Sequence, residues 1–249
     1  MALTPLVLLH PYPVDAGFWD PVRALLRPER PVLTPEAPGF GAAAPEPGWT
    51  VTGYADAVAG RIAEWAPGGR AAVCGLSLGG YVALAIAARH PGLLAALVLA
   101  DTRAEPDDDT ALAGRADGIA RIEIEGADGY LRDFLPRVVS PSAPDAPRGA
   151  LAALAGRQPP GTLCDALRAL AGRVDRRPDL PSVACPTLVV VGEDDAATPP
   201  AVARVMADGI PGARLAVVPG AGPMTALERP DAFAALVEEH LAPVDAAAG

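Results

Sequence analysis

The chain has 249 residues, of which 51% are hydrophobic and 4% aromatic, and its net charge is −10. This length fits one large domain, whose core must be filled by aliphatic side chains. The negative charge argues against nucleic acid as a partner, because the phosphates would be repelled. The three cysteines, Cys74, Cys164 and Cys185, have no metal-ligand spacing, and no signal or membrane segment is visible, so we expect a cytoplasmic protein.

Short apolar runs alternate with helical segments in the first part of the chain. Continuous apolar runs of this kind are typical of strands that are buried on both faces of a parallel sheet. The predicted strands are 6–9, 32–34, 71–74 and 94–100. Helices are predicted over 51–65 and 82–91, and the second of these ends at a proline.

The strand pattern disappears between residues 103 and 181. Helices are predicted here near 111–125, 128–139, 146–155 and 162–173, separated by proline-rich breaks. A structureless loop of this length is unusual in a compact domain, so we interpret 103–181 as an inserted helical cap. The run Asp107-Asp108-Asp109 at its start is interpreted as the solvated beginning of a helix and not as a metal site.

Strands return in the last part of the chain, at 187–191 and 213–218, with helices over 200–207 and 230–241. Strands that alternate with helices predict an α/β fold with a mostly parallel, doubly wound sheet. The core of this fold is assigned to residues 1–102 and 182–242. The small-residue segment 243–249 is expected to be a disordered tail.

A glycine-flanked serine separates the third predicted strand from the helix that follows it, in the sequence Gly75-Leu76-Ser77-Leu78-Gly79. A G-x-S-x-G pattern between a strand and a helix is that of a nucleophile elbow. The sharp turn strains the backbone at the serine, and the two glycines leave the room that side chains would fill. The following helix directs its first N–H groups toward developing negative charge. The alternative is an ordinary serine in a glycine-rich turn.

Three further segments carry the pattern of one family: the loop that begins at His10, the loop of residues 192–198, and 220–230, which reads Gly-Ala-Gly-x-Met-Thr-Ala-Leu-Glu-Arg-Pro. With the elbow, nearly the whole chain resembles the α/β-hydrolase superfamily, and it is most similar to small bacterial esterases, haloperoxidase-like enzymes and C–C hydrolases. The resemblance implies an α/β-hydrolase fold and a catalytic triad in the order Ser, Asp, His.

The resemblance assigns Ser77 as the nucleophile and Asp195 as the acid that orients a histidine, with Asp194 and Asp101 as alternatives. The histidine itself is absent, because Pro223 stands where the family pattern places it, and proline has neither an ionisable group nor a backbone N–H. Without a base the serine stays a neutral hydroxyl. Loss of one triad member costs a factor of about a million, or about 8 kcal/mol, so efficient hydrolysis by the usual route is not expected.

The three histidines of the chain lie elsewhere in the sequence. His90 is expected to be structural and His240 to be exposed near the end of the last helix. By the resemblance, the loop after the first strand forms half of an oxyanion hole, with the N–H groups of Tyr12 and Leu78 as its donors. His10 in this loop either braces it or serves as a substitute general acid or base.

The pocket is expected to include Phe40, Tyr130, Phe134 and Met224, with core packing as the alternative for the two cap aromatics. We expect an enzyme that acts on a small, largely apolar substrate with a carbonyl group, by cyclisation, elimination, rearrangement or weak hydrolysis. No metal, cofactor, membrane or nucleic acid is implied, and the oligomeric state stays open. The alternatives are a ligand-binding pseudoenzyme and an ordinary esterase whose histidine was lost recently or by mutation.

Overall fold

A computed structural model describes residues 3–247 of the chain. Its strands form one six-stranded sheet in the order β2-β1-β3-β4-β5-β6, and every neighbouring pair is parallel. The strands are β1 (Leu6–Leu9), β2 (Val32–Leu33), β3 (Ala71–Leu76), β4 (Leu94–Ala100), β5 (Thr187–Gly192) and β6 (Arg214–Val218). The structure therefore confirms the predicted α/β fold with a parallel, doubly wound sheet.

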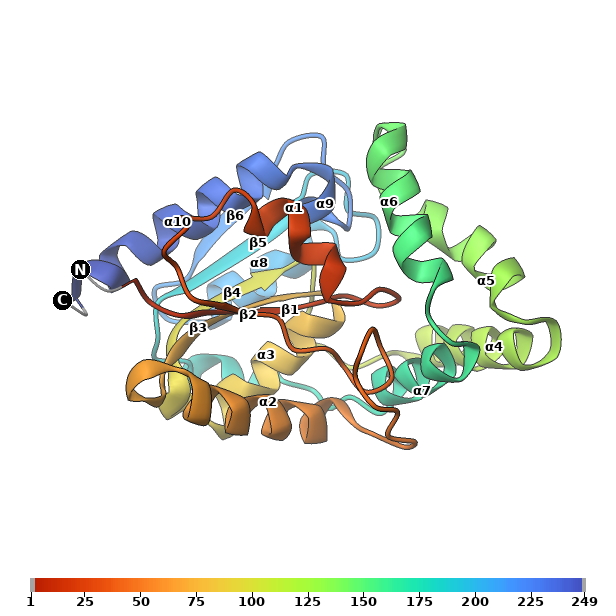
Figure 1. Ribbon diagram of the computed structural model, residues 1–249, viewed down its shortest axis with the longest axis horizontal. Coiled ribbons are helices and arrows are strands. Elements are labelled where there is room, and N and C mark those ends of the chain that lie inside the picture. The colour runs from red at the N-terminus through yellow and green to blue at the C-terminus, as the bar shows by residue number, and fades with distance from the viewer. Residues whose placement is uncertain (1–2, 248–249) are drawn as a thin grey trace.

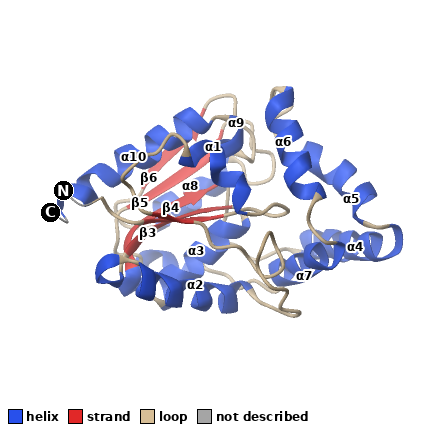
Figure 2. Cartoon of the chain, in the orientation of Figure 1, coloured by secondary structure: helices blue, strands red, loops and turns tan. Residues whose placement is uncertain are grey.

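Helices cover both faces of this sheet (Figure 1). The helices outside the β4–β5 connection are α1 (Asp20–Arg23), α2 (Val51–Trp65), α3 (Leu78–Arg89), α8 (Pro200–Gly209), α9 (Thr225–Glu228) and α10 (Pro230–Ala247). Figure 2 shows α2 and α3 on one side of the red strands, and α1 and α10 on the other. All residues of β1, β3 and β5 are buried, which explains why these strands read as continuous apolar runs and not as alternating patterns.

The segment between β4 and β5 is a separate layer of helices beyond one end of the sheet (Figure 1). These helices are α4 (Asp109–Glu125), α5 (Ala127–Phe134), α6 (Asp145–Gly156) and α7 (Pro160–Ala171). In this layer α4 packs against α7 and α5. The side chain of Asp108 caps α4 by accepting a hydrogen bond from the Ala111 N–H at 2.8 Å.

Two expectations for the C-terminus are wrong. Residues 243–247 are the last part of α10 and not a disordered tail, while residues 248–249 lie outside the described part of the chain. The carboxylate of Asp245 anchors this end, because it accepts hydrogen bonds from the Thr4 N–H at 2.7 Å and from the Arg30 guanidinium at 2.9 Å. His240, in the same helix, is buried and not exposed.

Candidate active site

Ser77 lies at the junction of β3 and α3 with φ 51° and ψ −112°, a strained conformation for a residue with a side chain. The two glycines around it are required by close backbone contacts. A Cβ on Gly75 would lie 2.1 Å from the Gly79 carbonyl oxygen, and a Cβ on Gly79 would lie 2.0 Å from that of Leu9. The packing of β1, β3 and α3 thus holds the serine in this turn.

Ser77 lines a cavity of about 210 Å³ between the sheet and the helical insertion. Its walls are formed by the loop after β1, the elbow, the insertion and the loop after β6. The lining residues include Tyr12, Phe134, Leu170, Pro223 and Met224. Its volume is below the roughly 300–1,000 Å³ that is usual for pockets of drug-sized ligands. The cavity therefore suits a small substrate.

Two backbone N–H groups are available beside the serine. Tyr12 lines the cavity, and Leu78 is the first residue of α3, directly after Ser77. Within residues 3–247, neither the Tyr12 nor the Leu78 N–H donates a hydrogen bond. The positive end of the α3 dipole adds to their effect on an anion. Both N–H groups thus lack a partner in the described part of the chain, and their role as oxyanion donors stays a prediction.

The carboxylate of Asp195 is buried and bound by its own loop. One oxygen accepts hydrogen bonds from the N–H groups of Ala197 and Thr198 at 2.8 and 2.7 Å, and the other accepts from the Thr198 hydroxyl at 2.6 Å. The neighbouring Asp194 is exposed and accepts a hydrogen bond from the Ser140 hydroxyl at 2.9 Å. Asp195 is therefore a fixed, buried acid, while Asp194 belongs to the surface.

Asp101, at the end of β4, is a second buried carboxyl group, and unlike Asp195 it lines the cavity. It accepts hydrogen bonds from the Gly192 N–H at 3.1 Å and from the N–H and hydroxyl of Thr225 at 3.0 and 2.6 Å. Burial, and next the nearby charge of Asp195, raise the pKa of Asp101 well above its usual value. Of the three acids named from the sequence, Asp195 and Asp101 are thus both buried and close enough for their charges to interact.

Glu228 is a site residue that the sequence reasoning did not single out. Its buried carboxylate accepts hydrogen bonds from the N–H groups of Gly222 at 3.1 Å and Met224 at 3.3 Å. These two residues flank Pro223, so Glu228 fixes the loop that presents the proline to the cavity. Glu228 belongs to the segment 220–230 that carries the family resemblance, but that resemblance assigned it no role.

None of the three histidines of the chain lines the cavity. His10 is buried, its Nε2 accepts a hydrogen bond from the Ala37 N–H at 3.0 Å, and its Nδ1 lies 3.0 Å from the Pro11 carbonyl oxygen. Burial lowers the pKa of His10, which favours this neutral, doubly bonded ring. Both nitrogens are engaged by backbone groups, so the geometry fits the bracing interpretation and leaves no free nitrogen for the catalytic one. His90 and His240 lie in other parts of the fold.

Two of the four expected pocket residues are not part of the cavity lining. Phe40 is fully buried in the core, with its ring centroid 5.2 Å from that of His10. Tyr130 stacks on Phe134 at 5.4 Å between centroids, and its hydroxyl accepts a hydrogen bond from the Tyr12 hydroxyl at 3.2 Å. Tyr130 therefore supports the cavity wall from behind, which is the packing alternative.

The expectation that Asp107 is solvated is wrong. Its side chain is only 3% exposed and forms ion pairs with Arg115 and Arg173. All three residues line the cavity, together with Arg103. No local pattern predicts this cluster, because its members come from the segment before α4, from α4 and from the turn after α7.

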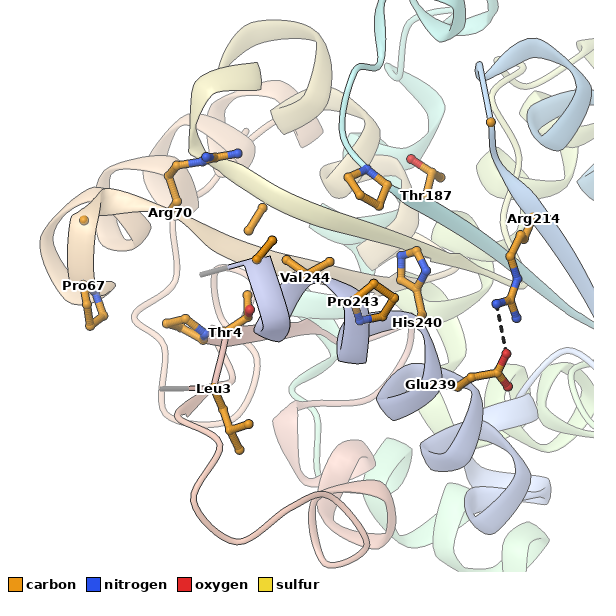
Figure 3. A pocket seen from close by; sticks show the side chains of 16 residues that line it. Leu3, Thr4, Pro67, Arg70, Thr187, Arg214, Glu239, His240, Pro243 and Val244 are labelled. Atoms are coloured by element: carbon orange, nitrogen blue, oxygen red, sulfur yellow. Dashed lines mark hydrogen bonds and ion pairs between the residues drawn. The ribbon is translucent and has the colours of Figure 1, made fainter. Parts of the chain in front are cut away.

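A larger cavity, of about 710 Å³, lies at the opposite end of the sheet (Figure 3). It is lined by residues at the beginnings of strands, such as Thr4, Thr187 and Arg214, and by His240 and Val244 of α10. Ligands of open α/β sheets bind at the carboxyl ends of the strands. The cavity at Ser77 lies at those ends and contains the strained serine, so we assign the candidate active site there.

A strained serine between a strand and a helix, in a parallel sheet with a helical insertion, defines an α/β hydrolase. The sequence profile of the Alpha/beta hydrolase family matches residues 6–236, and the chain belongs to this family. Within residues 3–247, no helix is long and apolar enough to cross a membrane, and no cluster of three or more His, Cys, Asp or Glu residues is arranged to hold a metal ion.

Three of the similar proteins are named as esterases or as a lactonase. The chain is 34% identical to the pimeloyl-[acyl-carrier protein] methyl ester esterase of Aromatoleum aromaticum, over 94% of this chain and 96% of that protein. It is 33% identical to an esterase of Thermogutta terrifontis solved with malate bound, with a TM-score of 0.91 over 97% of this chain and 90% of that one. The enol-lactonase of Burkholderia xenovorans is 28% identical, with a TM-score of 0.83 over 96% and 91%. The chain is thus a hydrolase-like enzyme.

Proposed function

We propose that this enzyme acts on the carbonyl group of a small ester or lactone held over Ser77, and that it does so without a histidine to activate the serine. One observation carries the proposal: Ser77 and Pro223 line the same cavity, and none of the chain's three histidines does. The substrate class is supported by the relatives, which are named as esterases and an enol-lactonase.

The N–H groups of Tyr12 and Leu78 are proposed to bind the carbonyl oxygen. Such donors are fixed before the reaction and become most effective as negative charge develops on the oxygen, each contributing about 2.7–4 kcal/mol to the barrier reduction. This electrostatic effect needs no imidazole. An enzyme that has lost its triad but keeps its oxyanion donors and its binding surface still accelerates the reaction by about 10³–10⁴-fold over the uncatalysed reaction in water.

The missing base decides which reactions this site favours. Attack by the neutral hydroxyl of Ser77 is slower by a factor of about a million than attack by an activated serine, which corresponds to about 8 kcal/mol. Reactions in which the substrate supplies its own nucleophile or base avoid this cost, because the cavity needs only to hold the reacting groups together. We therefore propose cyclisation, elimination or rearrangement as the efficient chemistry, with slow hydrolysis of activated esters beside it.

The proposal is tested by incubating the enzyme with a panel of p-nitrophenyl esters and lactones and identifying the products by mass spectrometry. The wild type should turn over activated esters slowly, and Ser77→Ala should remove most of this turnover. Ser182→Ala changes an exposed serine outside the cavity and serves as the matched control. If Ser77→Ala hydrolyses the activated esters as fast as the wild type, Ser77 takes no part in that reaction, and if neither forms products above the uncatalysed background, the cavity is a ligand-binding site and the chain a pseudoenzyme.

A further inference from the structure

The cavity at Ser77 has a surplus of positive charge, although the whole protein carries a net charge of −10. Arg103, Arg115 and Arg173 line it, against two carboxyl groups, Asp101 and Asp107. Burial alone would raise the pKa of Asp107, but hydrogen bonds from Arg115 and the charges of both arginines hold it below its usual value. Asp107 is therefore ionised, and it is shared by two guanidinium groups.

Arg173 is held rigidly in the cavity wall, with its side chain only 4% exposed. Its guanidinium donates hydrogen bonds to the carbonyl oxygens of Glu105 at 3.3 Å and Leu170 at 3.2 Å, and lies 4.4 Å above the ring of Tyr81. Nη2 is the nitrogen of this group that donates no hydrogen bond within residues 3–247. A guanidinium fixed in this way loses little further entropy when it binds a ligand.

Arg115, which lines the same cavity and binds the same carboxylate, has a second nitrogen without a hydrogen-bond partner in the described residues. Its Nε and Nη2 donate to Asp107, the latter at 3.2 Å, while Nη1 donates no hydrogen bond within the described residues. Its side chain is 20% exposed, and that of Asp107 is 3% exposed. One buried carboxylate thus compensates two largely buried guanidinium groups, an arrangement that is costly unless an anion completes it.

We propose that the substrate carries a carboxylate, which binds to the free nitrogens of Arg115 and Arg173 while the ester or lactone carbonyl lies at Ser77. Guanidinium groups match carboxylates in shape and bind them by charge-assisted hydrogen bonds. The cavity volume of about 210 Å³ leaves room for a short carbon chain between the two ends. The substrate class is thus the half-ester or lactone of a small dicarboxylic acid, which replaces the largely apolar substrate expected from the sequence.

This inference rests on the proposed function for the position of the carbonyl, but it is tested by binding alone. Monomethyl glutarate and methyl valerate are probes of similar size that differ in one carboxylate. Isothermal titration calorimetry on the full chain should show the half-ester binding about tenfold or more tightly than the neutral ester, and Arg173→Met or Arg115→Met should remove this difference. Arg132→Met changes an exposed arginine of α5 and should leave binding unchanged.

A second variant changes the affinity in the opposite direction. Asp107→Asn removes the competing negative charge and should tighten binding of the half-ester, which a general loss of structure would not do. Circular dichroism verifies the fold of each variant. Equal affinity for both esters, an unchanged affinity in folded Arg173→Met, or equally tight binding of inorganic phosphate would overturn the inference. Selective binding of the half-ester without any turnover would refute the proposed function and leave the anion site standing.

Discussion

Replacing Pro223 with histidine should raise Ser77-dependent ester hydrolysis by about ten- to a hundredfold. The substitution places an imidazole in the wall of the cavity that contains the serine. It breaks no backbone hydrogen bond, because proline has no N–H to donate. The carboxylate of Glu228 holds the N–H groups of Gly222 and Met224 on either side, so the loop should keep its course.

The size of the gain follows from the carboxyl groups that would orient the new imidazole. A complete triad is worth a factor of about a million over one without its histidine, and a positioned general base alone about 10²–10⁴. Asp195 and Asp101 each already accept three hydrogen bonds, largely from Thr198 and Thr225, which leaves about one lone-pair position on each. A misplacement of about 1 Å costs about a hundredfold, so restoration should be partial.

The assay is p-nitrophenolate release, measured as kcat/KM across the range in which histidine titrates. Pro223→His should acquire a limb near pKa 6.5, because only the neutral imidazole accepts the serine proton. Pro223→Ala removes the proline ring without adding a base and should show no gain. Combining Pro223→His with Asp101→Asn or with Asp195→Asn should identify the carboxyl group that orients the ring. An equal gain in Pro223→Ala, a gain that survives Ser77→Ala, or no gain in a folded variant would refute this reasoning.

Two further predictions concern stability. Gly79→Ala should lower the free energy of unfolding by about 1–3 kcal/mol, because its Cβ would lie 2.0 Å from the Leu9 carbonyl oxygen, whereas Gly149→Ala, in an open helical position, should be neutral or stabilising in the same urea titration. Burial alone would raise the pKa of Asp245, but hydrogen bonds from Arg30 hold it below its usual value, so its stabilising contribution is present above about pH 4 and is lost as the pH falls through the folded pKa. Asp245→Asn should therefore destabilise at neutral pH and much less near about pH 3.

Each stability prediction has an outcome that contradicts it. If Gly79→Ala unfolds at the same urea concentration as the wild type, the close contact between α3 and β1 is not required for the fold. If the difference between wild type and Asp245→Asn is the same at both pH values, the ion pair with Arg30 does not stabilise the protein through the charge of the carboxylate.

The sheet and the elbow could be predicted because their signals are local. A strand buried on both faces must be apolar throughout, as in residues 6–9, and the sharp turn at Ser77 requires glycine at Gly75, because a Cβ there would meet the backbone of Gly79 only four residues on. Most of the helices in the insertion were predicted to within a few residues, because prolines separate them. Local chemistry was therefore sufficient for the fold class.

Features that depend on distant partners could not be predicted. The end of α10 is stabilised by the contact of Asp245 with Arg30, which is 215 residues away in sequence. Likewise, Asp107 is buried because two arginines from the insertion surround it, although an acidic run on its own suggests a solvated surface. The charge of the cavity, and with it the expected substrate class, depends on such pairs.

The most direct test of catalysis without an imidazole is the pH dependence of Ser77 acylation. Acetylation by p-nitrophenyl acetate can be followed by intact mass, with Ser77→Ala as the control for other sites. A serine without a base should react slowly, and its rate should rise with pH between about 5.5 and 8.5 without a plateau, because the hydroxyl itself must lose its proton. A rate that instead levels off above a pKa of about 6–7, and loses this limb when a histidine is replaced, would show that an imidazole activates Ser77 after all.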